Sequence, residues 1–212
     1  MADKEEIEGK SITIGFEARR CIHSRNCVLG HPEVFVPNVE GEWIHPDAAS
    51  PEAVAEIAHS CPSGAITYRR RDGGANEAPP VVNLARLREN GPIAFHAPLT
   101  IAGEKAGFRA TLCRCGASKR KPFCDTGHHG AGFTASGEPK PRDSAALAQR
   151  DGDLAVTPLR NGPLQIDGNL ELVSGTGRTI NRVTQTFLCR CGGSANKPYC
   201  DGTHAKIGFT AP

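Results

Sequence analysis

The chain has 212 residues and a formal net charge of +2 at neutral pH, and 38% of its residues are hydrophobic while 5% are aromatic. With 24 glycines and 16 prolines as well, it has little apolar material for a core, so we expect small domains stapled by metal or disulfides. The small charge gives no reason to expect nucleic acid, and no apolar run approaches the roughly 18 residues that cross a bilayer. Because the acidic, polar opening does not resemble an export signal, we expect a cytoplasmic protein with reduced cysteines.

The first third of the chain predicts a strand, a helix and a closing strand. Polar and apolar residues alternate over residues 11–16, which is typical of a strand. Ser50-Pro51 is typical of a helix start, and that helix is predicted to end just before Cys61. Residues 65–69 can form the closing strand. Turn-forming residues without periodicity fill residues 72–80 and predict a linker.

Beyond this linker the chain repeats itself. Asn-Gly-Pro occurs at Asn90 and again at Asn161, and alternating residues then predict strands at 94–96 and 165–167. The tail Gly132-Phe133-Thr134-Ala135 recurs 76 residues later. Two copies of one supersecondary unit are therefore predicted, able to pack on each other.

The nine cysteines form three groups of three, and two groups carry a histidine at the same spacing. These two groups are Cys113, Cys115, Cys124 with His128, and Cys189, Cys191, Cys200 with His204. Two cysteines one residue apart can bind one metal atom, and a cysteine and a histidine four residues apart can bind a second if that stretch starts a helix. Spacing alone is compatible with a [2Fe-2S] cluster in each copy and also with one Cys3His zinc site in each.

The residues between these ligands resemble the CDGSH iron-sulfur domain of the mitoNEET family. The family signature is C-x-C-x2-(S/T)-x3-P-x-C-D-G-(S/A/T)-H, and the second copy matches it throughout, with Cys200-Asp201-Gly202-Thr203-His204 at its end. The resemblance implies one [2Fe-2S] cluster per copy, with the two neighbouring cysteines on one iron and the last cysteine and the histidine on the other, more exposed iron. With one imidazole among three thiolates, we expect a reduction potential between those of all-cysteine and two-histidine clusters, and loss of the clusters in acid.

The first copy departs from the signature at Thr126-Gly127, where the family has glycine followed by a small residue. If the backbone there needs positive φ, threonine is strained. His129 is an alternative ligand, or simply a solvated loop histidine.

Four residues are expected to support the ligands without binding metal: Ser118, Asp125, Ser194 and Asp201. The serine hydroxyls can cap a turn or bond a cluster sulfur. The aspartates follow a ligating cysteine at an expected helix start, where a carboxylate can accept free backbone N–H groups, whether as caps alone or also as tuning groups.

The first group, Cys21, Cys27 and Cys61, has a different spacing. Its surroundings, including Cys61-Pro62-Ser63-Gly64-Ala65-Ile66, resemble the divergent single-cluster ferredoxin domain over roughly residues 10 to 70. In four-iron relatives a cysteine stands where this chain has Ser24. Three thiolates suit a [3Fe-4S] cluster most directly, whereas a [4Fe-4S] cluster needs Ser24, His23 or solvent as fourth ligand, and an empty site is a third possibility.

We therefore expect an α+β protein of four segments: a ferredoxin-like domain (1–72), a linker (73–80) and two CDGSH domains (81–137 and 138–212). In single-motif relatives two chains pair through a strand-built cap, so the two copies are expected to form an intrachain pseudo-dimer and the chain to be a monomer. Between them, residues 136–150 are predicted to be a loop with one short helical turn at 145–149.

The leading functional prediction is electron transfer, and no nucleophile-base set or phosphate-binding loop indicates an enzyme. The alternatives are an iron-sulfur cluster carrier or redox and pH sensor, and a zinc-stabilised binding module. The expected partner is a redox protein or an apo-acceptor. It is expected to be acidic if the cations Lys119-Arg120-Lys121 dock it by electrostatic steering; the alternative is an ordinary solvated loop.

Overall fold

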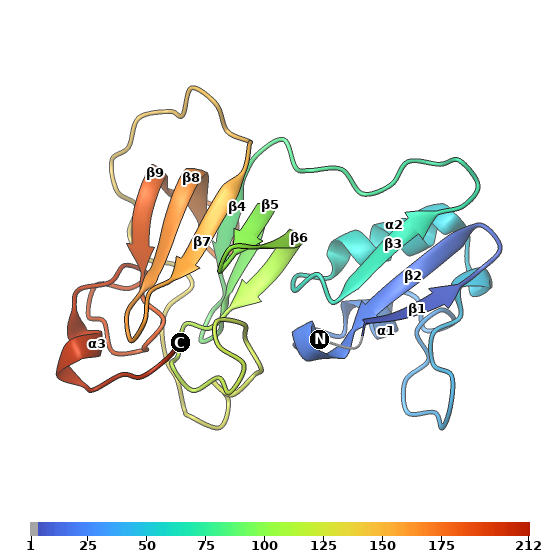
Figure 1. Ribbon diagram of the computed structural model, residues 1–212, viewed down its shortest axis with the longest axis horizontal. Coiled ribbons are helices and arrows are strands. Elements are labelled where there is room, and N and C mark those ends of the chain that lie inside the picture. Colours follow the sequence, from blue (N-terminus) through green and yellow to red (C-terminus); the bar gives the residue numbers. More distant parts are fainter. Residues whose placement is uncertain (1–3) are drawn as a thin grey trace. The chain divides into compact units, whose positions relative to one another are not determined.

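The computed structural model describes residues 4–212, which divide into two compact units between Ala78 and Pro79 (Figure 1). Residues 1–3, which belong to the first predicted domain, lie outside the described residues. The other predicted boundaries, at 72, 80 and 137, remain predictions. Among the helices of residues 4–212, none has both the length and the apolar character that a bilayer span requires.

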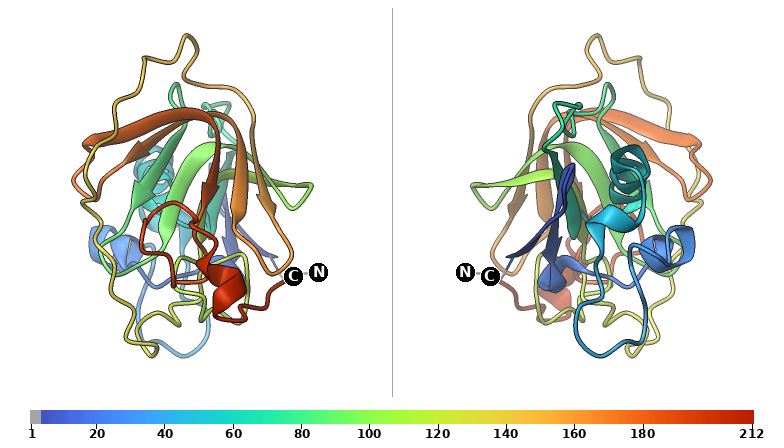
Figure 2. Two further views of the ribbon diagram at one scale, coloured as in Figure 1. Left: turned by 90° about the vertical axis from the view of Figure 1, so that its left-hand side faces the viewer. Right: turned by 90° about the vertical axis from the view of Figure 1, so that its right-hand side faces the viewer.

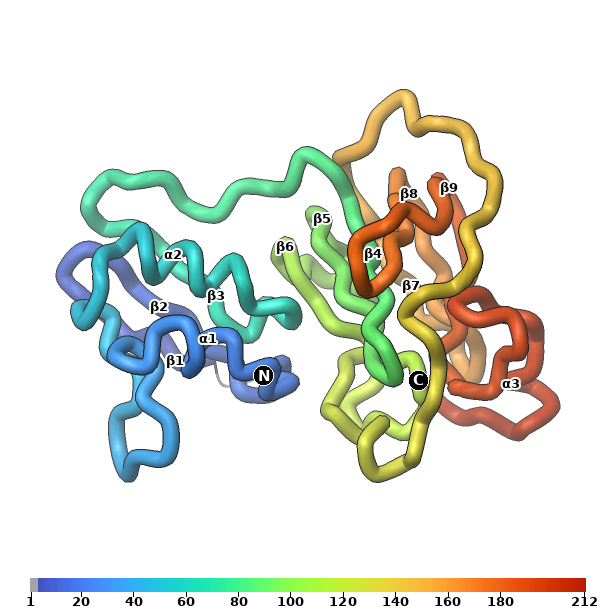
Figure 3. Tube along the Cα trace, turned by 180° about the vertical axis from the view of Figure 1, so that it is seen from behind, coloured from blue at the N-terminus to red at the C-terminus, as the bar shows by residue number. Residues whose placement is uncertain are grey.

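The first unit is a three-stranded antiparallel sheet with two helices on one face (Figures 2 and 3). Its elements are β1 (Lys4–Glu8), β2 (Ile12–Glu17), α1 (Asn26–Gly30), α2 (Pro51–Ser60) and β3 (Ile66–Arg70), with short 3-10 turns at Ala18–Arg20 and Pro46–Ala48. The core lies between sheet and helices and includes Ile12, Ile14, Phe35, Val54 and Ala58. Burial of these side chains is what drives this unit to fold.

The predicted helix and both predicted strands of this unit are confirmed within one residue. Ser50 is the N-cap of α2 and its hydroxyl accepts a hydrogen bond from the Ala53 N–H at 3.2 Å. Strand β1 was missed, because its sequence Lys-Glu-Glu-Ile-Glu is almost entirely polar and exposed. Strand β1 lies at the edge of the sheet and forms by pairing with β2. With one apolar residue, it lacks the alternation of polar and apolar residues that indicates a strand.

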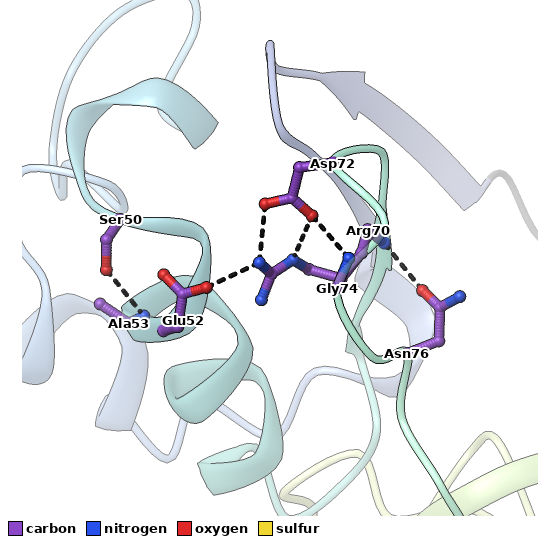
Figure 4. A network of polar contacts seen from close by, with 7 residues as sticks. All are labelled: Ser50, Glu52, Ala53, Arg70, Asp72, Gly74 and Asn76. Atoms are coloured by element: carbon purple, nitrogen blue, oxygen red, sulfur yellow. Dashed lines mark hydrogen bonds and ion pairs between the residues drawn. The ribbon is translucent and has the colours of Figure 1, made fainter.

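Arg70 ties the end of β3 to both α2 and the following turn (Figure 4). Its guanidinium donates to Glu52 at 2.6 Å and to Asp72 at 2.7 and 2.9 Å, and its backbone N–H donates to Asn76 at 2.8 Å. The hydrogen bond from Arg70, then that from the Gly74 N–H, lowers the pKa of Asp72 to about 2. This contribution to stability is present above the ordinary pKa near 3.8 and disappears as the pH falls through about 2.

The second unit is built on six strands: β4 (Leu84–Leu87), β5 (Ile93–Ile101), β6 (Glu104–Leu112), β7 (Leu154–Pro158), β8 (Leu164–Val173) and β9 (Thr179–Leu188). The one helix in its described residues is α3 (Thr203–Lys206). Both ligand loops follow the same end of these strands, after β6 and after β9 (Figure 1). The predicted strands at 94–96 and 165–167 are confirmed as parts of β5 and β8, which are longer than the sequence indicated.

The two copies exchange partners through their short first strands. Strand β4 pairs antiparallel with β5 of its own copy and parallel with β8 of the other. Strand β7 repeats this, antiparallel with β8 and parallel with β5. Because β4, β5, β7 and β8 are joined in a ring of pairings, neither copy has a complete sheet without the other.

The connector between the copies runs beside the 175–182 segment and has no helical turn at 145–149, so that prediction was wrong. Two hydrogen bonds hold the connector to this segment. The Gly175 N–H donates to Gly137 O at 2.9 Å, and the Arg142 N–H donates to Ile180 O at 2.8 Å. At Gly137 and Arg142 the connector bonds to this neighbouring segment and not to its own backbone, so it runs as an extended chain.

The two ligand loops touch through their backbones. Cys115 and Cys191 form an isolated antiparallel bridge. A Cβ added to Gly116 would lie 2.5 Å from the Cys191 carbonyl oxygen, and one added to Gly192 would lie 2.5 Å from that of Cys115. Both glycines also have positive φ, of 80° and 81°. Only glycine fits either position, because a side chain would push the loops apart.

Replacing Gly192 with alanine should therefore lower the free energy of unfolding by about 2 to 4 kcal/mol, from the positive φ and the backbone clash together. Urea unfolding measures this. The control is Gly103→Ala, since Gly103 has φ 84° and no heavy atom within 4 Å of an added Cβ. It should lose only about 1 kcal/mol, and equal losses for the two variants would contradict the close approach of the loops.

Thr126 adopts φ 67° and its counterpart Gly202 adopts φ 83°, so the positive φ that strains threonine is present. Thr126→Gly should raise the free energy of unfolding by roughly 1 kcal/mol, because glycine adopts the left-handed conformation without the strain that a β-branched residue has there. Urea unfolding measures this. The reverse change, Gly202→Thr, should destabilise by a similar amount. A loss of stability in Thr126→Gly would argue against this strain.

Candidate metal centres

In the first repeat the predicted ligands lie as two close pairs. The sulfurs of Cys113 and Cys115 are 3.7 Å apart, and the Cys124 sulfur is 3.6 Å from Nδ1 of His128. Strand β6 delivers the first pair directly at its end, because Cys113 follows Leu112. The Cys113 N–H donates to Pro122 O and the Cys124 N–H to Thr111 O, which folds the loop back so that the second pair lies beside the first.

The second repeat has the same arrangement. The sulfurs of Cys189 and Cys191 are 3.6 Å apart, and the Cys200 sulfur lies 3.3 Å from Nδ1 of His204. The backbone bonds recur as well, from Cys189 to Pro198 O and from Cys200 to Phe187 O. The repeated pattern in the sequence therefore corresponds to a repeated geometry.

These distances suit two ligands that share one metal atom. Two sulfurs each about 2.3 Å from one tetrahedral metal lie about 3.8 Å apart, and a sulfur and an imidazole nitrogen lie about 3.5 Å apart. Each repeat thus offers two bidentate donor pairs, and soft thiolates are the donors that iron-sulfur clusters use. Within residues 4–212, no three His, Cys, Asp or Glu side chains converge on a single metal position.

Burial keeps several of these thiols protonated in the metal-free chain. It raises the pKa of Cys124 to about 11 and also raises that of Cys191. In the first close pair, the hydrogen bond to Cys113, followed by burial, raises the pKa of Cys115. Desolvation, with the neighbouring His129 second, lowers the pKa of His128, so its imidazole stays neutral and able to bind metal. Metal binding must displace the thiol protons.

Both predicted serines cap a turn, which is one of the two roles expected for them. The Ser118 hydroxyl donates to Phe123 O at 2.7 Å and accepts from the Arg120 N–H at 3.0 Å. Ser194 makes the same two contacts with Tyr199 and Asn196. The serines hold the loop in which the paired ligands sit.

The two aspartates accept backbone N–H groups on either side of the last cysteine. Asp125 bonds the N–H groups of Lys119 and Gly127 at 2.8 and 2.9 Å, and Asp201 bonds those of Ala195 and Thr203 at 2.8 and 3.0 Å. Although partial burial acts to raise it, the pKa of Asp125 is lowered by these bonds. Hydrogen bonds from the side chain and backbone of Thr203 likewise lower the pKa of Asp201.

After the aspartate the two repeats differ. His204 lies in the short helix α3, whereas His128 lies in a series of turns, so the expected helix start forms only in the second repeat. The His129 ring packs on His128 with centroids 4.2 Å apart. Cys124 and His128 are buried, at 3% and 9% exposure, while Cys200 and His204 are partly exposed.

Two buried arginines between the paired cysteines were missed from the sequence. Arg114 and Arg190 are each 1% exposed. Arg114 donates to the backbone carbonyls of Arg88, Gly91, Ala135 and Ser136. Arg190 donates to those of Leu159, Gly162 and Pro212. An arginine at the same place in both repeats was the signal that could have found them.

These arginines explain why the copies share an opening and a tail. Asn90 in the opening and Ala135 in the tail exchange two hydrogen bonds, of 3.0 and 2.9 Å, and Asn161 and Ala211 do the same at 2.9 Å. Each tail phenylalanine lies over the arginine of its own copy, Phe133 at 5.5 Å from Arg114 and Phe209 at 5.7 Å from Arg190. The opening and tail therefore form the wall of each arginine site.

The lysines before the loop prolines link the two copies. The ammonium of Lys121 donates to Ser118 O and lies 5.8 Å from the ring of Phe209, and Lys197 makes the equivalent contacts with Ser194 O and Phe133. Lys121 is thus engaged inside the second unit, which weakens the idea that all three cations of Lys119–Lys121 serve a partner.

In the first unit the three remaining cysteines, Cys21, Cys27 and Cys61, line one cavity of about 440 Å³. Ser24 and His23, the predicted alternative ligands, line the same cavity. Burial raises the pKa of Cys27, and Cys61 and Cys21 add smaller effects in the same direction. The Cys61 sulfur also lies 3.6 Å from the hydroxyl of Ser63, a contact that the sequence did not indicate.

The loop that carries Cys21 and Cys27 is shaped by two residues with positive φ, His23 at 51° and Arg25 at 65°. The His23 N–H points to the sulfur of Cys21 at 3.4 Å. Such N–H donors stabilise a thiolate, and strained residues of this kind occur where a loop must wrap a site. The donor set and the mostly apolar lining fit a ferredoxin-type cluster.

Comparison with protein-family models agrees with this division. Residues 7–71 match the family described as divergent 4Fe-4S mono-cluster. Residues 90–129 and 161–205 each match the family described as iron-binding zinc finger, CDGSH type. The two CDGSH matches include all eight predicted ligands of the second unit.

Two curated proteins are similar to parts of the chain. The uncharacterised protein YjdI of Escherichia coli K12 is 38% identical over 64 residues, which is 30% of this chain and 82% of YjdI. CDGSH iron-sulfur domain-containing protein 1 of Mus musculus is 32% identical over 90 residues, 42% of this chain and 73% of the mouse protein. With two such segments behind a divergent mono-cluster domain, the chain belongs to the CDGSH iron-sulfur family and is an iron-sulfur protein.

Proposed function

We propose that this protein transfers electrons through two [2Fe-2S] clusters, one in each repeat, and one ferredoxin-type cluster in the first unit. The observation that carries the proposal is the recurrence of two donor pairs per repeat, at 3.7 and 3.6 Å in the first and 3.6 and 3.3 Å in the second. Two pairs match the two irons of a [2Fe-2S] cluster, whereas a single tetrahedral zinc needs all four ligands on one atom.

The cluster supplies one-electron chemistry when bound, and the chain supplies its ligands and surroundings. Cys113 and Cys115 would hold one iron and Cys124 with His128 the other, and the second repeat does the same with its own four ligands. A neutral imidazole in place of one thiolate raises the reduction potential relative to an all-cysteine cluster. Serine and aspartate contacts hold the loop rigid, which favours fast electron exchange over rearrangement.

For the first unit we propose a [3Fe-4S] cluster bound by Cys21, Cys27 and Cys61, because these are the thiolates that line its cavity. A [4Fe-4S] cluster is the alternative, with Ser24, His23 or solvent on the fourth iron. The family description favours the four-iron form, while the number of thiolates favours three.

We also propose that the two repeats form an intrachain pseudo-dimer and that the chain acts as a monomer. The exchange of β4 and β7 supports this, since each repeat supplies a strand to the sheet of the other. Partner identity and compartment stay predictions: a redox protein or apo-acceptor, met in the cytoplasm. Lys119 and Arg120 are both exposed in the first ligand loop and are the cations there that an acidic partner would meet.

Cluster transfer to an apo-acceptor is the second candidate. The partial exposure of Cys200 and His204 favours it, because an accessible cysteine and histidine are where an incoming thiolate can replace a ligand. If the second cluster moves to an added apo-acceptor while the first is retained, the result supports cluster transfer. Reduction and reoxidation without loss of either cluster supports electron transfer.

Anaerobically purified protein should be red-brown and contain roughly seven irons per chain with a three-iron cluster in the first unit, or roughly eight with a four-iron cluster, and about eight acid-labile sulfides in either case. Cys191→Ser should lose about two irons and two sulfides, since one [2Fe-2S] cluster loses a ligand. Electron paramagnetic resonance then separates three-iron, four-iron and two-iron centres in one sample. A colourless protein with stoichiometric zinc and no sulfide would establish the zinc-stabilised binding module instead.

Acid should release both [2Fe-2S] clusters as the pH falls below about 6.5, the ordinary pKa of histidine. Protons compete with iron for the imidazoles of His128 and His204 and for the Cys124 thiolate, whose pKa in the metal-free chain is raised to about 11. Because protonation favours the metal-free form, the chain should bind its [2Fe-2S] clusters less tightly as the pH falls. Loss of the clusters is measured as loss of visible absorbance between about pH 8 and pH 4.

The matched variants for this experiment are His128→Gln and His129→Gln. The first should lose one cluster even at about pH 8, whereas the second should keep both, because His129 packs on the ligand without binding metal in the proposed centre. A visible band unchanged at about pH 4, or equal losses in the two variants, would contradict the ligand assignment.

A further inference from the structure

The two arginines between the paired cysteines have an unusual environment for a charged group. Each is 1% exposed, and among residues 4–212 neither forms an ion pair with a carboxylate. Arg114 is solvated by four backbone carbonyls instead, at 2.6 to 3.1 Å. Carbonyl dipoles solvate a buried cation but do not neutralise it, so a buried guanidinium of this kind calls for a nearby negative charge.

Arg190 is solvated less completely than Arg114. It donates to three carbonyls, at 2.6 to 2.8 Å. Its Nη1 group is buried and has no hydrogen-bond partner within the described part of the chain. A buried N–H without a partner costs stability, so the charge of Arg190 depends even more on its electrostatic surroundings.

The nearby thiols belong to both repeats. Burial lowers the pKa of Arg114, while Glu89, Cys189 of the other repeat and Cys115 of its own act against that change. Burial also lowers the pKa of Arg190, and Cys113 of the other repeat acts against it. This reciprocity follows from the bridge between Cys115 and Cys191, which places the two ligand loops back to back.

A loaded centre adds negative charge beside both arginines, beyond that of Glu89 near Arg114. Two ferric ions, two sulfides and three thiolates carry one net negative charge, the imidazole being neutral, and uptake of one electron from an external donor adds a second. A fixed positive charge in a dry surrounding therefore stabilises the reduced form more than the oxidised form.

We infer that Arg114 and Arg190 are the buried counter-charges of the two [2Fe-2S] centres and that each acts on both, so that the arginine of one repeat helps to set the reduction potential of the other. This inference rests on the proposed function. It makes the pair of repeats one electrostatic unit: reduction of one centre uses part of the positive charge that stabilises reduction of its neighbour.

The experiment compares Arg114→Gln, Arg114→Lys and Arg160→Gln by spectroelectrochemical titration of the loaded full chain. Arg114→Gln should lower both midpoint potentials. The reduction equilibrium constant of its own centre should fall about tenfold, which is about 59 mV for a one-electron couple, and that of the other centre should fall by less. Arg114→Lys keeps the charge and should stay near the parent protein. Arg160 is exposed in the same unit, so its neutralisation should change neither midpoint.

The possible outcomes separate this inference from the function on which it rests. Absence of iron and sulfide from the parent protein would refute the proposed function. Loaded Arg114→Gln with both midpoints unchanged would overturn the counter-charge role, and a fall confined to one midpoint would overturn its action on both centres. If Arg114→Gln holds no cluster, Arg190→Gln gives the same test from the other repeat. Loss of clusters from both glutamine variants, with circular dichroism unchanged and clusters retained in the lysine variant, would support the inference.

Discussion

The contact between the two ligand loops is the constraint on which the second unit depends. Gly116 and Gly192 each face the carbonyl of the opposite paired cysteine at a distance that leaves no room for a side chain. This contact brings four of the eight predicted ligands to the boundary between the repeats. It also encloses Arg114 and Arg190, because a guanidinium beside one pair of thiols is then near the other pair.

The strands above the loops maintain this contact. Exchange of β4 and β7 prevents either repeat from separating without breaking its own sheet, and the buried core runs continuously through both copies. The tails also join the two copies, since Phe133 and Phe209 each contact an arginine of their own copy and a lysine of the other. Such mutual dependence suits a unit whose apolar core is small and whose ligands must not move.

The repeats are similar in their ligands and different in their surroundings. In the second, the connector lays Arg142 on the Tyr199 ring, with the guanidinium 3.6 Å from the ring centroid and a hydrogen bond to Asn196 at 3.0 Å. In the first, Thr126 is strained and His129 covers the histidine. The two candidate centres, with the same donor set, therefore have different local environments, and surroundings of this kind tune the properties of a bound metal group.

What the sequence determined by itself is local. Ligand types and spacing, the Ser50 cap, the positive φ at position 126 and the turn-capping serines all depend on hydrogen bonds and ligand pairs within a few residues, so short patterns predict them. Tertiary structure alone decided the strand exchange, the extended connector and the burial of the arginines. Those features join residues far apart in the chain, such as Arg86 paired with Val173 or Arg114 with Arg88, and no local pattern carries that information. Burial depends on which parts of the chain meet in space. Arginine is usually a surface residue, yet Arg114 and Arg190 are the most buried cations of the second unit because the two copies pack together around them.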